Sequence, residues 1–182
     1  MTGESAPHPR GRAIVVMGVS AAGKSTVAAA LARRFGIDWA DADDLHPPAN
    51  VAKMAAGIPL DDDDRAPWLA AVGRRLADGA AGGGLVVACS ALKRGYRDLL
   101  RDACPDAVFV YLDGSPRLLS ARAAERTEHF MPPGLLDSQF AILEPLQRDE
   151  RGIRVDVDDS VDDIVALAEK GVRGCDTDPG QR

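Results

Sequence analysis

The sequence predicts a single α/β domain in which helices cover both faces of a parallel β-sheet. Five short apolar runs, rich in β-branched residues, alternate along the chain with segments that have helical periodicity. The runs are continuous rather than interrupted at every second position, as expected of strands that are buried on both faces. Strands that alternate with helices over such distances form parallel sheets, because each crossover connection carries a helix.

The predicted strands are bounded by turn-forming residues. The second of them has the weakest pattern. They cover 13–18 (AIVVMG), 37–42 (IDWADA), 84–91 (GLVVACSA), 107–113 (AVFVYLD) and 153–157 (IRVDV).

Helical patterns fill the segments between the strands. After Pro67, apolar residues recur every four positions from Trp68 to Leu76. The last helix is expected to start behind Ser160, because Ser160 and Asp163 have the spacing of a capping box. We expect the glycine-rich segment 78–84 to be a loop that ends a helix.

Length, charge and cysteine content limit the class of protein. The chain of 182 residues is long enough for one domain with a full core. Its formal net charge of -6 argues against a protein whose main partner is DNA or RNA, because such a protein needs a basic face. Cys89, Cys104 and Cys175 contain no C-x-x-C pair, which favours neither a disulfide framework nor a zinc site. A reducing cytoplasm is therefore expected.

Both ends of the chain are expected to be disordered. Residues 1–12 and 173–182 are rich in glycine, proline and charge and have no periodicity. The chain has no apolar run near the roughly 20 residues needed to cross a bilayer, and its first residues lack the apolar core of a signal sequence. We predict one domain over 13–172 with no membrane partner.

The stretch GVSAAGKST, which begins at Gly18, matches the phosphate-binding pattern G-x-x-x-x-G-K-[ST]. It follows an apolar run and precedes a helical pattern, which is the context that the motif requires. In such a loop, backbone N–H groups and a helix N-terminus bind phosphates, Lys24 reaches the β- and γ-phosphates, and the Ser25 hydroxyl meets Mg²⁺. The sequence therefore predicts a nucleotide site.

Two aspartates follow the second predicted strand. If the strand stays extended through Asp41 and Asp43, their side chains fall on the same side. One could hold a metal-bound water while the other orients an acceptor hydroxyl. A solvated acidic loop is the alternative, and the phosphate loop just before it favours the functional interpretation.

Basic residues gather downstream in three segments, 46–54, 90–97 and 122–130. Arg122 and Arg126 are four residues apart and so share one helix face, from which two guanidinium groups could close over ATP phosphates. The alternative is a surface helix in which these arginines pair with neighbouring glutamates.

The loops after the second and third strands should both emerge beside the phosphate loop, where open α/β sheets bind their ligands. Their mixture of cations, amides, hydroxyls and carboxylates suits a ligand with a carboxylate and several hydroxyl groups. Few aromatic residues are available, which makes a stacked nucleobase less favoured, although composition alone does not select the molecule. The residues concerned are His46, Asn50, Lys53, Asp64, Arg65, Ser90, Lys93 and Arg97.

These segments resemble the gluconate kinases, relatives of shikimate kinase and of the nucleoside monophosphate kinases. The likeness covers nearly all of 13–168, and its most specific parts are LHPPANVAKMAAGIPLDDDDRAPWL and HFMPPGLLDSQFAILEP. The resemblance implies ATP-dependent phosphorylation of D-gluconate to 6-phospho-D-gluconate, which feeds the pentose phosphate pathway. It also implies the three-layer P-loop NTPase fold, with strand order 2-3-1-4-5 and a helical lid at about 122–140, and a homodimer.

The resemblance also assigns roles to individual residues. The ATP-binding set is Gly18, Ser20, Ala21, Ala22, Gly23, Lys24, Ser25 and Thr26 with the lid residues Arg122 and Arg126, and the metal-binding pair is Ser25 and Asp41. Lys24, Asp43, Arg122 and Arg126 are the expected catalytic residues. The residues expected to bind gluconate or to close the site over it are Asp43, His46, Lys53, Arg65, Lys93, Arg97, His129 and Gln139. Asp64 and Ser90, named above for the same ligand, complete this set.

Two details depart from the family pattern or stay open. Relatives often have glycine and serine where this chain has Ala21 and Ala22, which removes only a possible hydroxyl contact to the phosphates. The run of four aspartates at 61–64 leaves open which of them faces the substrate.

Two alternative functions remain. A kinase for another small hydroxy acid, such as shikimate, is disfavoured because the glycine triplet 82–84 precedes the third strand, whereas shikimate kinases carry a triplet after it. A nucleotide-dependent switch would need no set of residues that recognises a polyol, and steady ATPase activity without an acceptor would reveal it.

Overall fold

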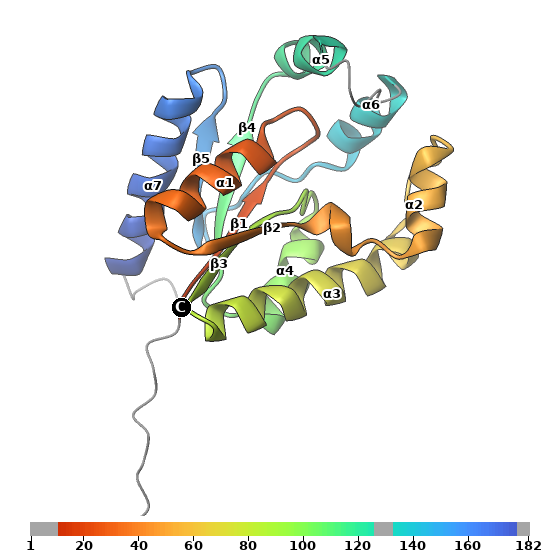
Figure 1. Ribbon diagram of the computed structural model, residues 1–182. Coiled ribbons are helices and arrows are strands. Elements are labelled where there is room, and N and C mark those ends of the chain that lie inside the picture. The colour runs from red at the N-terminus through yellow and green to blue at the C-terminus, as the bar shows by residue number, and fades with distance from the viewer. Residues whose placement is uncertain (1–10, 126–132, 178–182) are drawn as a thin grey trace, which may run out of the picture.

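The computed structural model describes residues 11–125 and 133–177. It contains a five-stranded parallel sheet with the order β2-β3-β1-β4-β5 (Figure 1). This confirms the expected strands, their parallel arrangement and their order. The strands are β1 (Arg12–Met17), β2 (Asp38–Asp41), β3 (Gly84–Ala88), β4 (Val108–Asp113) and β5 (Gly152–Asp156).

Helices cover both faces of the sheet, as predicted. In Figure 1, α1 and α7 lie on one face and α3 and α4 on the other, while α5 and α6 lie beyond the ends of the strands. The described helices are α1 (Lys24–Phe35), the 3₁₀ turn η1 (Ala42–Leu45), α2 (Pro48–Ala55), α3 (Asp62–Ala81), α4 (Arg94–Ala103), α5 (Pro116–Glu125), α6 (Pro133–Ile142) and α7 (Val161–Thr177).

The central strand β1 explains why the apolar runs are continuous. Successive side chains of a strand point to opposite faces of the sheet. Ile14 and Val16 therefore pack with α1 and α7, whereas Val15 and Met17 pack with α3 and α4, and all four are fully buried. Both faces of β1 consequently belong to a core.

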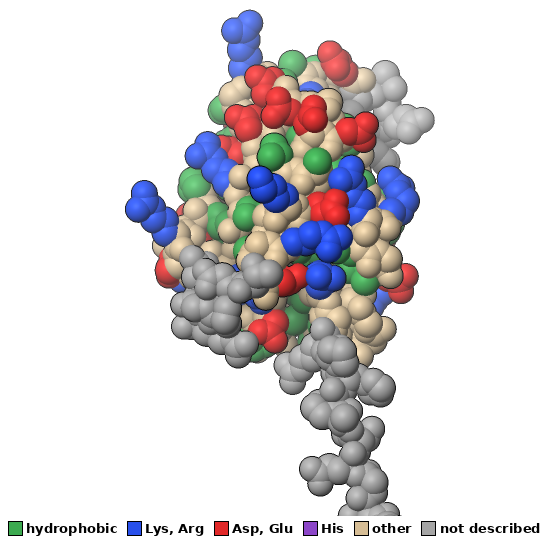
Figure 2. Space-filling model, turned by 90° about the vertical axis from the view of Figure 1, so that its left-hand side faces the viewer, with side chains coloured by type: hydrophobic (Ala, Val, Ile, Leu, Met, Phe, Trp, Pro, Cys, Tyr) green, Lys and Arg blue, Asp and Glu red, His purple; other side chains and the backbone are tan. Residues whose placement is uncertain are grey.

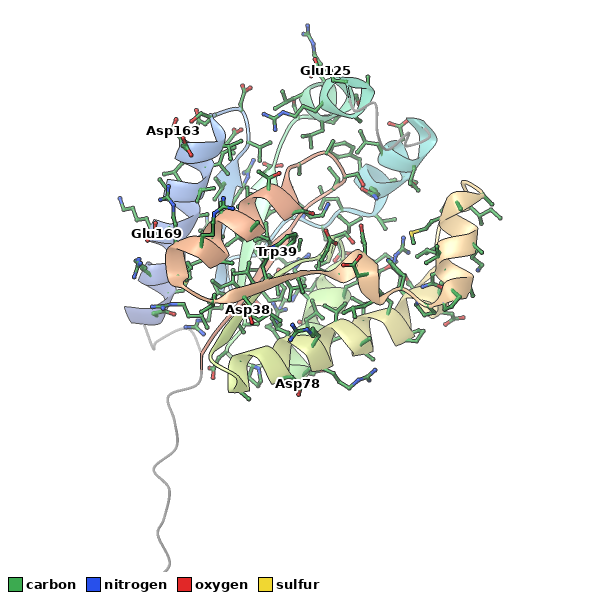
Figure 3. The ribbon with its side chains drawn as sticks, in the orientation of Figure 1. Asp38, Trp39, Asp78, Glu125, Asp163 and Glu169 are labelled. Carbon is green, nitrogen blue, oxygen red and sulfur yellow. The ribbon has the colours of Figure 1, made fainter. Side chains whose placement is uncertain are left out.

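The outermost strand β2 has a different character. Asp38 and Trp39, which Figure 3 labels, lie on this strand. Both are exposed, Trp39 to 42%. A short strand that carries a charged residue is a common way to keep the edge of a sheet from pairing with another chain. This mixture of polar and apolar residues gave β2 the weakest pattern in the sequence.

The folded unit extends beyond both predicted boundaries. Arg12, expected in a disordered tail, begins β1, and α7 continues to Thr177 instead of ending at 172. The two ends support each other, because Arg12 Nε donates to Asp176 Oδ2 over 2.8 Å. Arg151 adds a bond to the carbonyl of Cys175 over 2.9 Å. Local composition could not predict these contacts, because they join residues far apart in the sequence.

The predicted loop 78–84 is mostly helical. α3 continues to Ala81, and only Gly82 and Gly83 separate it from β3. Gly79 is required by packing rather than by a turn, because a Cβ on it would lie 2.4 Å from the Cβ of Leu85. The glycine lets α3 approach β3 closely.

Gly79→Ala should therefore destabilise the protein, although alanine is the better helix former. Overpacking a tight contact costs about 1–3 kcal/mol, against roughly 1 kcal/mol gained in helix propensity. Gly95→Ala in α4 is the matched control, since a Cβ there meets no atom within 4 Å, and it should raise the free energy of unfolding by about 0.4–1 kcal/mol. Urea titration measures both, and a stabilised Gly79→Ala protein would contradict the packing argument.

The face that carries α7 has mixed charge. Figure 2 shows acidic side chains gathered at one end of this face and basic side chains with acidic neighbours over its middle. Arg34 and Arg173, for example, both bind Glu169. Basic residues on this face are thus at least partly paired within the protein. In the described part of the chain, no helix has the length and apolar character needed to cross a membrane.

Candidate active site

The phosphate loop connects β1 to α1 at the carboxyl edge of the sheet. Gly18 adopts φ 142° and packs so closely that a Cβ would lie 2.7 Å from the carbonyl oxygen of Leu112. Its N–H donates to the carbonyl of Ser90 over 3.2 Å, which places the loop after β3 directly beside the phosphate loop. Lys24 Nζ donates to the carbonyl of Val19 over 3.0 Å and so crosses the loop that it belongs to.

Ala21 lies at a position of the phosphate loop that has backbone strain. It adopts φ 63°, in the left-handed region that favours glycine. A residue with a Cβ in such a conformation costs about 1–3 kcal/mol and persists only where its surroundings hold it. Ala21 and Ala22 are both buried, and this packing holds the loop.

Ser25 and Asp41 form the pair expected to hold Mg²⁺. Ser25 Oγ donates to Asp41 Oδ2 over 2.6 Å. A hydroxyl and a carboxylate beside a phosphate loop fit Mg²⁺, which takes hard oxygen ligands and is held through one or two protein groups together with substrate phosphates. Residues 11–125 and 133–177 contain no group of three or more His, Cys, Asp or Glu side chains that could hold a metal.

The backbone that positions Asp43 differs from the prediction. β2 ends at Asp41, and Asp43 lies in η1 rather than in an extended strand, so the argument from alternating side chains was wrong. Asp41 Oδ1 instead accepts the N–H of Asp43 over 3.0 Å and thereby caps the 3₁₀ turn. The two aspartates lie side by side because one caps the turn that carries the other.

The surroundings of Asp43 suit a proton acceptor. Desolvation by the surrounding protein raises the pKa of Asp43, the charge of Asp41 raises it further, and the charge of Lys24 opposes both. The side chain is still 79% exposed, so solvent screens these effects. A raised pKa makes a carboxylate a better acceptor of a hydroxyl proton.

His46 lies behind Asp43 and is held on both sides. Its ring stacks on Trp68, with 4.3 Å between the ring centroids, and its Nδ1 is 3.3 Å from the amide nitrogen of Asn50. Trp68 Nε1 also donates to the carbonyl of Ala42 over 2.7 Å. Burial lowers the pKa of His46, although the charge of Asp43 opposes this. These contacts fix η1 against α3, and His46 Nε2 comes to 3.9 Å from Asp43 Oδ1.

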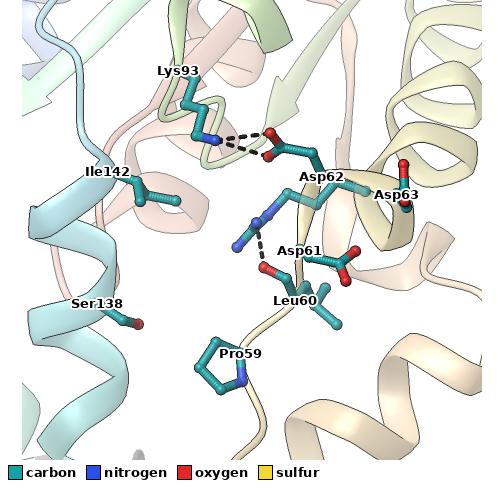
Figure 4. Close-up of a pocket in the computed structure, with 9 residues that line it drawn as sticks. Pro59, Leu60, Asp61, Asp62, Asp63, Lys93, Ser138 and Ile142 are labelled. Carbon is teal, nitrogen blue, oxygen red and sulfur yellow. Dashed lines mark hydrogen bonds and ion pairs between the residues drawn. The ribbon is translucent and has the colours of Figure 1, made fainter.

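A pocket of about 490 Å³ opens between the start of α3, the helix α6 and the loop after β3 (Figure 4). It combines two cations, three carboxylates, a hydroxyl and apolar groups. Its lining residues are Pro59, Leu60, Asp61, Asp62, Asp63, Arg65, Lys93, Ser138 and Ile142.

Two charged groups of the pocket, Lys93 and Asp62, are paired with each other. Lys93 Nζ lies 2.8 and 3.0 Å from the two carboxylate oxygens of Asp62, and the hydroxyl of Tyr96 donates to the same carboxylate. The bond from Lys93 is the main reason that the pKa of Asp62 is lowered. Arg65 donates to the carbonyl of Leu60 and to Tyr96. The pocket thus offers cations whose present partners a ligand carboxylate could replace.

Asp64 is not the aspartate that faces this pocket. Asp61 and Asp64 form a reciprocal capping box at the start of α3. The Asp64 carboxylate also binds Lys53 at 2.6 and 2.7 Å. The structure therefore pairs two predicted substrate residues, Lys53 and Asp64, with each other, and brings Asp61, Asp62 and Asp63 to the pocket instead.

Arg97 is also placed differently from the prediction. Its side chain is fully buried and forms a bidentate pair with Glu150 at 2.7 and 2.8 Å. The same guanidinium donates to the carbonyls of Ala91 and Glu144. Arg97 is thus in no position to bind a substrate. It holds the loop after β3, in which Ala91 has φ 43°, against the segment that follows α6.

Of the remaining predicted residues, some are described by the structure and others are not. Arg122 donates to the carbonyl of Val157 over 2.7 Å, and so lies against the loop after β5. The backbone of Ser90 contacts the phosphate loop, as described above, and Thr26 is exposed at the start of α1. Arg126 and His129 lie outside the described residues, so the paired lid arginines and the closing of the lid stay predictions.

Gln139 reaches the phosphate loop rather than the pocket. Its Oε1 accepts the N–H of Ser20 over 2.7 Å, across 119 positions of sequence.

Cys89 is buried beneath the site. Burial raises the pKa of its thiol to about 12, which excludes it as a nucleophile at neutral pH.

Comparison with known proteins places this chain. The sequence model of the family described as Shikimate kinase matches residues 20–167. A gluconokinase from Gluconobacter oxydans (strain 621H) is 52% identical over 145 residues, covering 79% of this chain and 82% of that protein. The chain belongs to the gluconokinase family. A second member, a probable gluconokinase from Xenopus tropicalis, is 44% identical over 172 residues, covering 86% of this chain and 90% of that protein.

A solved structure agrees with this membership. The crystal structure of a gluconokinase from Sinorhizobium meliloti 1021 matches with a TM-score of 0.84 and 47% identity, covering 92% of this chain and 94% of that one. The resemblance to gluconokinases that the sequence motifs indicated is confirmed, and so is the fold.

Sequence reasoning missed several residues that shape this gluconokinase-family site. Asp62 and Tyr96 line or support the pocket, and Trp68 and Glu150 hold the loops around it. One signal was available: the spacing of Asp61 and Asp64 is that of Ser160 and Asp163, where a capping box was expected and where Ser160 Oγ accepts the N–H of Asp163. Recognising it would have moved attention from Asp64 to its neighbours.

Proposed function

We propose that the protein is a gluconokinase, which transfers the γ-phosphoryl group of ATP to a hydroxyl group of D-gluconate and forms 6-phospho-D-gluconate. One observation carries this proposal: a phosphate loop with adjacent carboxylates opens beside a pocket that offers both cations and carboxylates. A sugar acid has one carboxylate and several hydroxyl groups, and this mixture of partners matches both.

Each group has a role in the proposed transfer. Lys24 would neutralise charge on the β- and γ-phosphates, while Ser25 and Asp41 would hold Mg²⁺. Bound there, Mg²⁺ would stabilise charge on the phosphate oxygens. Asp43 would orient the acceptor hydroxyl and accept its proton as the hydroxyl attacks. Lys93 and Arg65 would exchange their present partners for the carboxylate of gluconate.

A coupled assay of ADP release tests the proposal with gluconate, shikimate and nucleoside monophosphates as acceptors. Gluconate should support turnover, and the others should not. Shikimate is disfavoured because Gly82 to Gly84 lie at the start of β3, at the opposite edge of the sheet from the phosphate loop. ADP release at the same rate without any acceptor would indicate a nucleotide-dependent switch and sink the proposal.

Asp43→Asn should separate the roles of the two aspartates. The substitution keeps the shape of the side chain and removes its charge, so kcat should fall about a hundredfold while the Michaelis constant for ATP changes little. Steady-state kinetics with both substrates measures this. If only ATP binding weakens, Asp43 belongs with the metal ligands and Asp41 with the acceptor.

The cellular setting of the enzyme is part of the proposal. We expect it to act in the cytoplasm as a homodimer, without nucleic acid or membrane as partner. The mass of the purified protein in solution tests the dimer.

A further inference from the structure

The helix α6 lies between the two parts of the site. Ser138 and Ile142, one turn apart, line the pocket (Figure 4). Gln139, on the next position of the same helix, binds the N–H of Ser20 in the phosphate loop over 2.7 Å. Leu136 is 4% exposed and belongs to the same core cluster as Val19. A wall of the pocket is therefore attached to the phosphate loop.

The peptide that Gln139 binds is held from both ends. Its carbonyl belongs to Val19 and accepts from Lys24 Nζ over 3.0 Å, and its N–H belongs to Ser20 and donates to Gln139. Lysine at this position of a phosphate loop meets the β- and γ-phosphates. The bond from Gln139 thus ends on the peptide unit beside which the transferred phosphate is expected.

The segment that follows α6 is attached to the loop that carries Lys93. The N–H of Glu144 donates to the carbonyl of Leu92 over 2.8 Å, and the Glu144 carboxylate accepts the N–H of Arg94 over 2.6 Å. An acid at the start of α4 is also favoured by the helix dipole. The segment from α6 to Glu144 consequently contacts both the phosphate loop and the loop that carries a cation of the pocket.

We propose that Gln139 is a positioning residue, which fixes the acceptor pocket relative to the phosphate loop and does not itself bind gluconate. This inference rests on the proposed function. Phosphoryl transfer requires the acceptor oxygen to stand in line with the γ-phosphate, and a displacement of about 1 Å can cost a hundredfold in rate. A bond that ties the pocket wall to the phosphate loop limits such displacement.

Gln139→Met tests the proposal, because methionine has a similar length but an acceptor too weak to hold the Ser20 N–H. At saturating substrates its kcat with gluconate should fall about tenfold. The dissociation constant for ATP and the Michaelis constant for gluconate should stay within about twofold of wild type. More ADP than 6-phosphogluconate should be formed, because water competes better with a misplaced acceptor.

Gln139→Glu restores an oxygen acceptor and should recover part of kcat at saturating ATP. Asp137→Asn, an exposed change on the same helix, should match wild type.

The outcomes separate three possibilities. A higher Michaelis constant for gluconate with normal kcat would make Gln139 a direct substrate ligand. Loss of ATP binding by Gln139→Met would mean that the bond serves the phosphate loop alone. Either result overturns the proposal, as does an unchanged kcat, or a glutamate variant as slow as the methionine variant. Wild-type protein that fails to phosphorylate gluconate would overturn the proposed function and this inference together, whereas active wild type with an unaffected methionine variant overturns the inference alone.

Discussion

Replacing Lys24 by alanine is expected to lower kcat/KM for phosphoryl transfer at least about a thousandfold. Removing one preorganised hydrogen-bond donor that stabilises the transition state lowers the rate about 10²–10³-fold, and Lys24 supplies a full positive charge as well. The fold should survive, because Lys24 is the first residue of α1 and alanine is the best helix former. The bond from Lys24 to Val19 is lost, but glycine geometry and burial of Ala21 and Ala22 still shape the loop.

Lys170→Ala is the matched control, since Lys170 is an exposed lysine on α7 far along the chain from the phosphate loop. The assay couples ADP release to gluconate addition, and circular dichroism with a thermal melt confirms that both variants are folded. A folded Lys24→Ala protein with near-normal turnover would contradict the assignment of this loop as the site that binds the phosphates of ATP.

Glu150→Gln should lower the free energy of unfolding by about 3–5 kcal/mol, because it leaves the Arg97 charge buried without its counter-ion. Both side chains are fully buried, and Glu150 also accepts from Arg101 over 2.8 Å. In Arg97→Met with Glu150→Leu no buried charge is left unpaired, but the carbonyls of Ala91 and Glu144 lose their donor, so part of the destabilisation should remain. Glu169→Gln is the control: its pairs with Arg34 and Arg173 lie at the surface and should contribute less than about 1 kcal/mol.

The same pair predicts a dependence of stability on pH. Burial alone would raise the pKa of Glu150, but bonds from Arg97, the N–H of Gln147 and Arg101 outweigh it and lower the pKa to about 2. A lowered pKa in the folded state means that the contribution is present above the ordinary value of 4.5 and is lost as pH falls from there towards 2. Urea titrations over this range should show a steeper loss for wild type than for Glu150→Gln. Parallel profiles, or a loss below about 1 kcal/mol at neutral pH, would show that the pair does not anchor this region.

The parts of the fold that could be predicted depend on local patterns. The strands and the phosphate loop are each specified by a short run of residues, so their existence followed from the sequence. The ends of α3 and α7 did not, because Gly79 and Asp176 act through contacts with Leu85 and Arg12 that lie far away in sequence. Composition marked these segments as loop and tail, and tertiary contacts made them helical.

The candidate site shows the same division. Ser25 and Asp41 meet as expected, since the phosphate loop and the adjacent strand place them. Arg97 was assigned to the substrate because it follows a basic loop, but its partner Glu150 is 53 positions away and nothing local indicates the pair. Asp62 could not be singled out from its neighbours because the partners that distinguish it, Lys93 and Tyr96, belong to other elements.

The buried pair has a consequence for the order in which the molecule is assembled. Chains emerge from the ribosome N-terminus first, at about 5–20 residues per second. The residues of β1 and of the phosphate loop emerge early, whereas the guanidinium of Arg97 beneath the loop after β3 is neutralised only when Glu150, 53 residues later, has emerged. The phosphate loop also depends on later residues, because Gly18 packs against Leu112 and donates to Ser90, and Ser20 donates to Gln139. Synthesis through Glu150, and not of the central strands alone, is therefore needed before the phosphate loop and the acceptor pocket can form together.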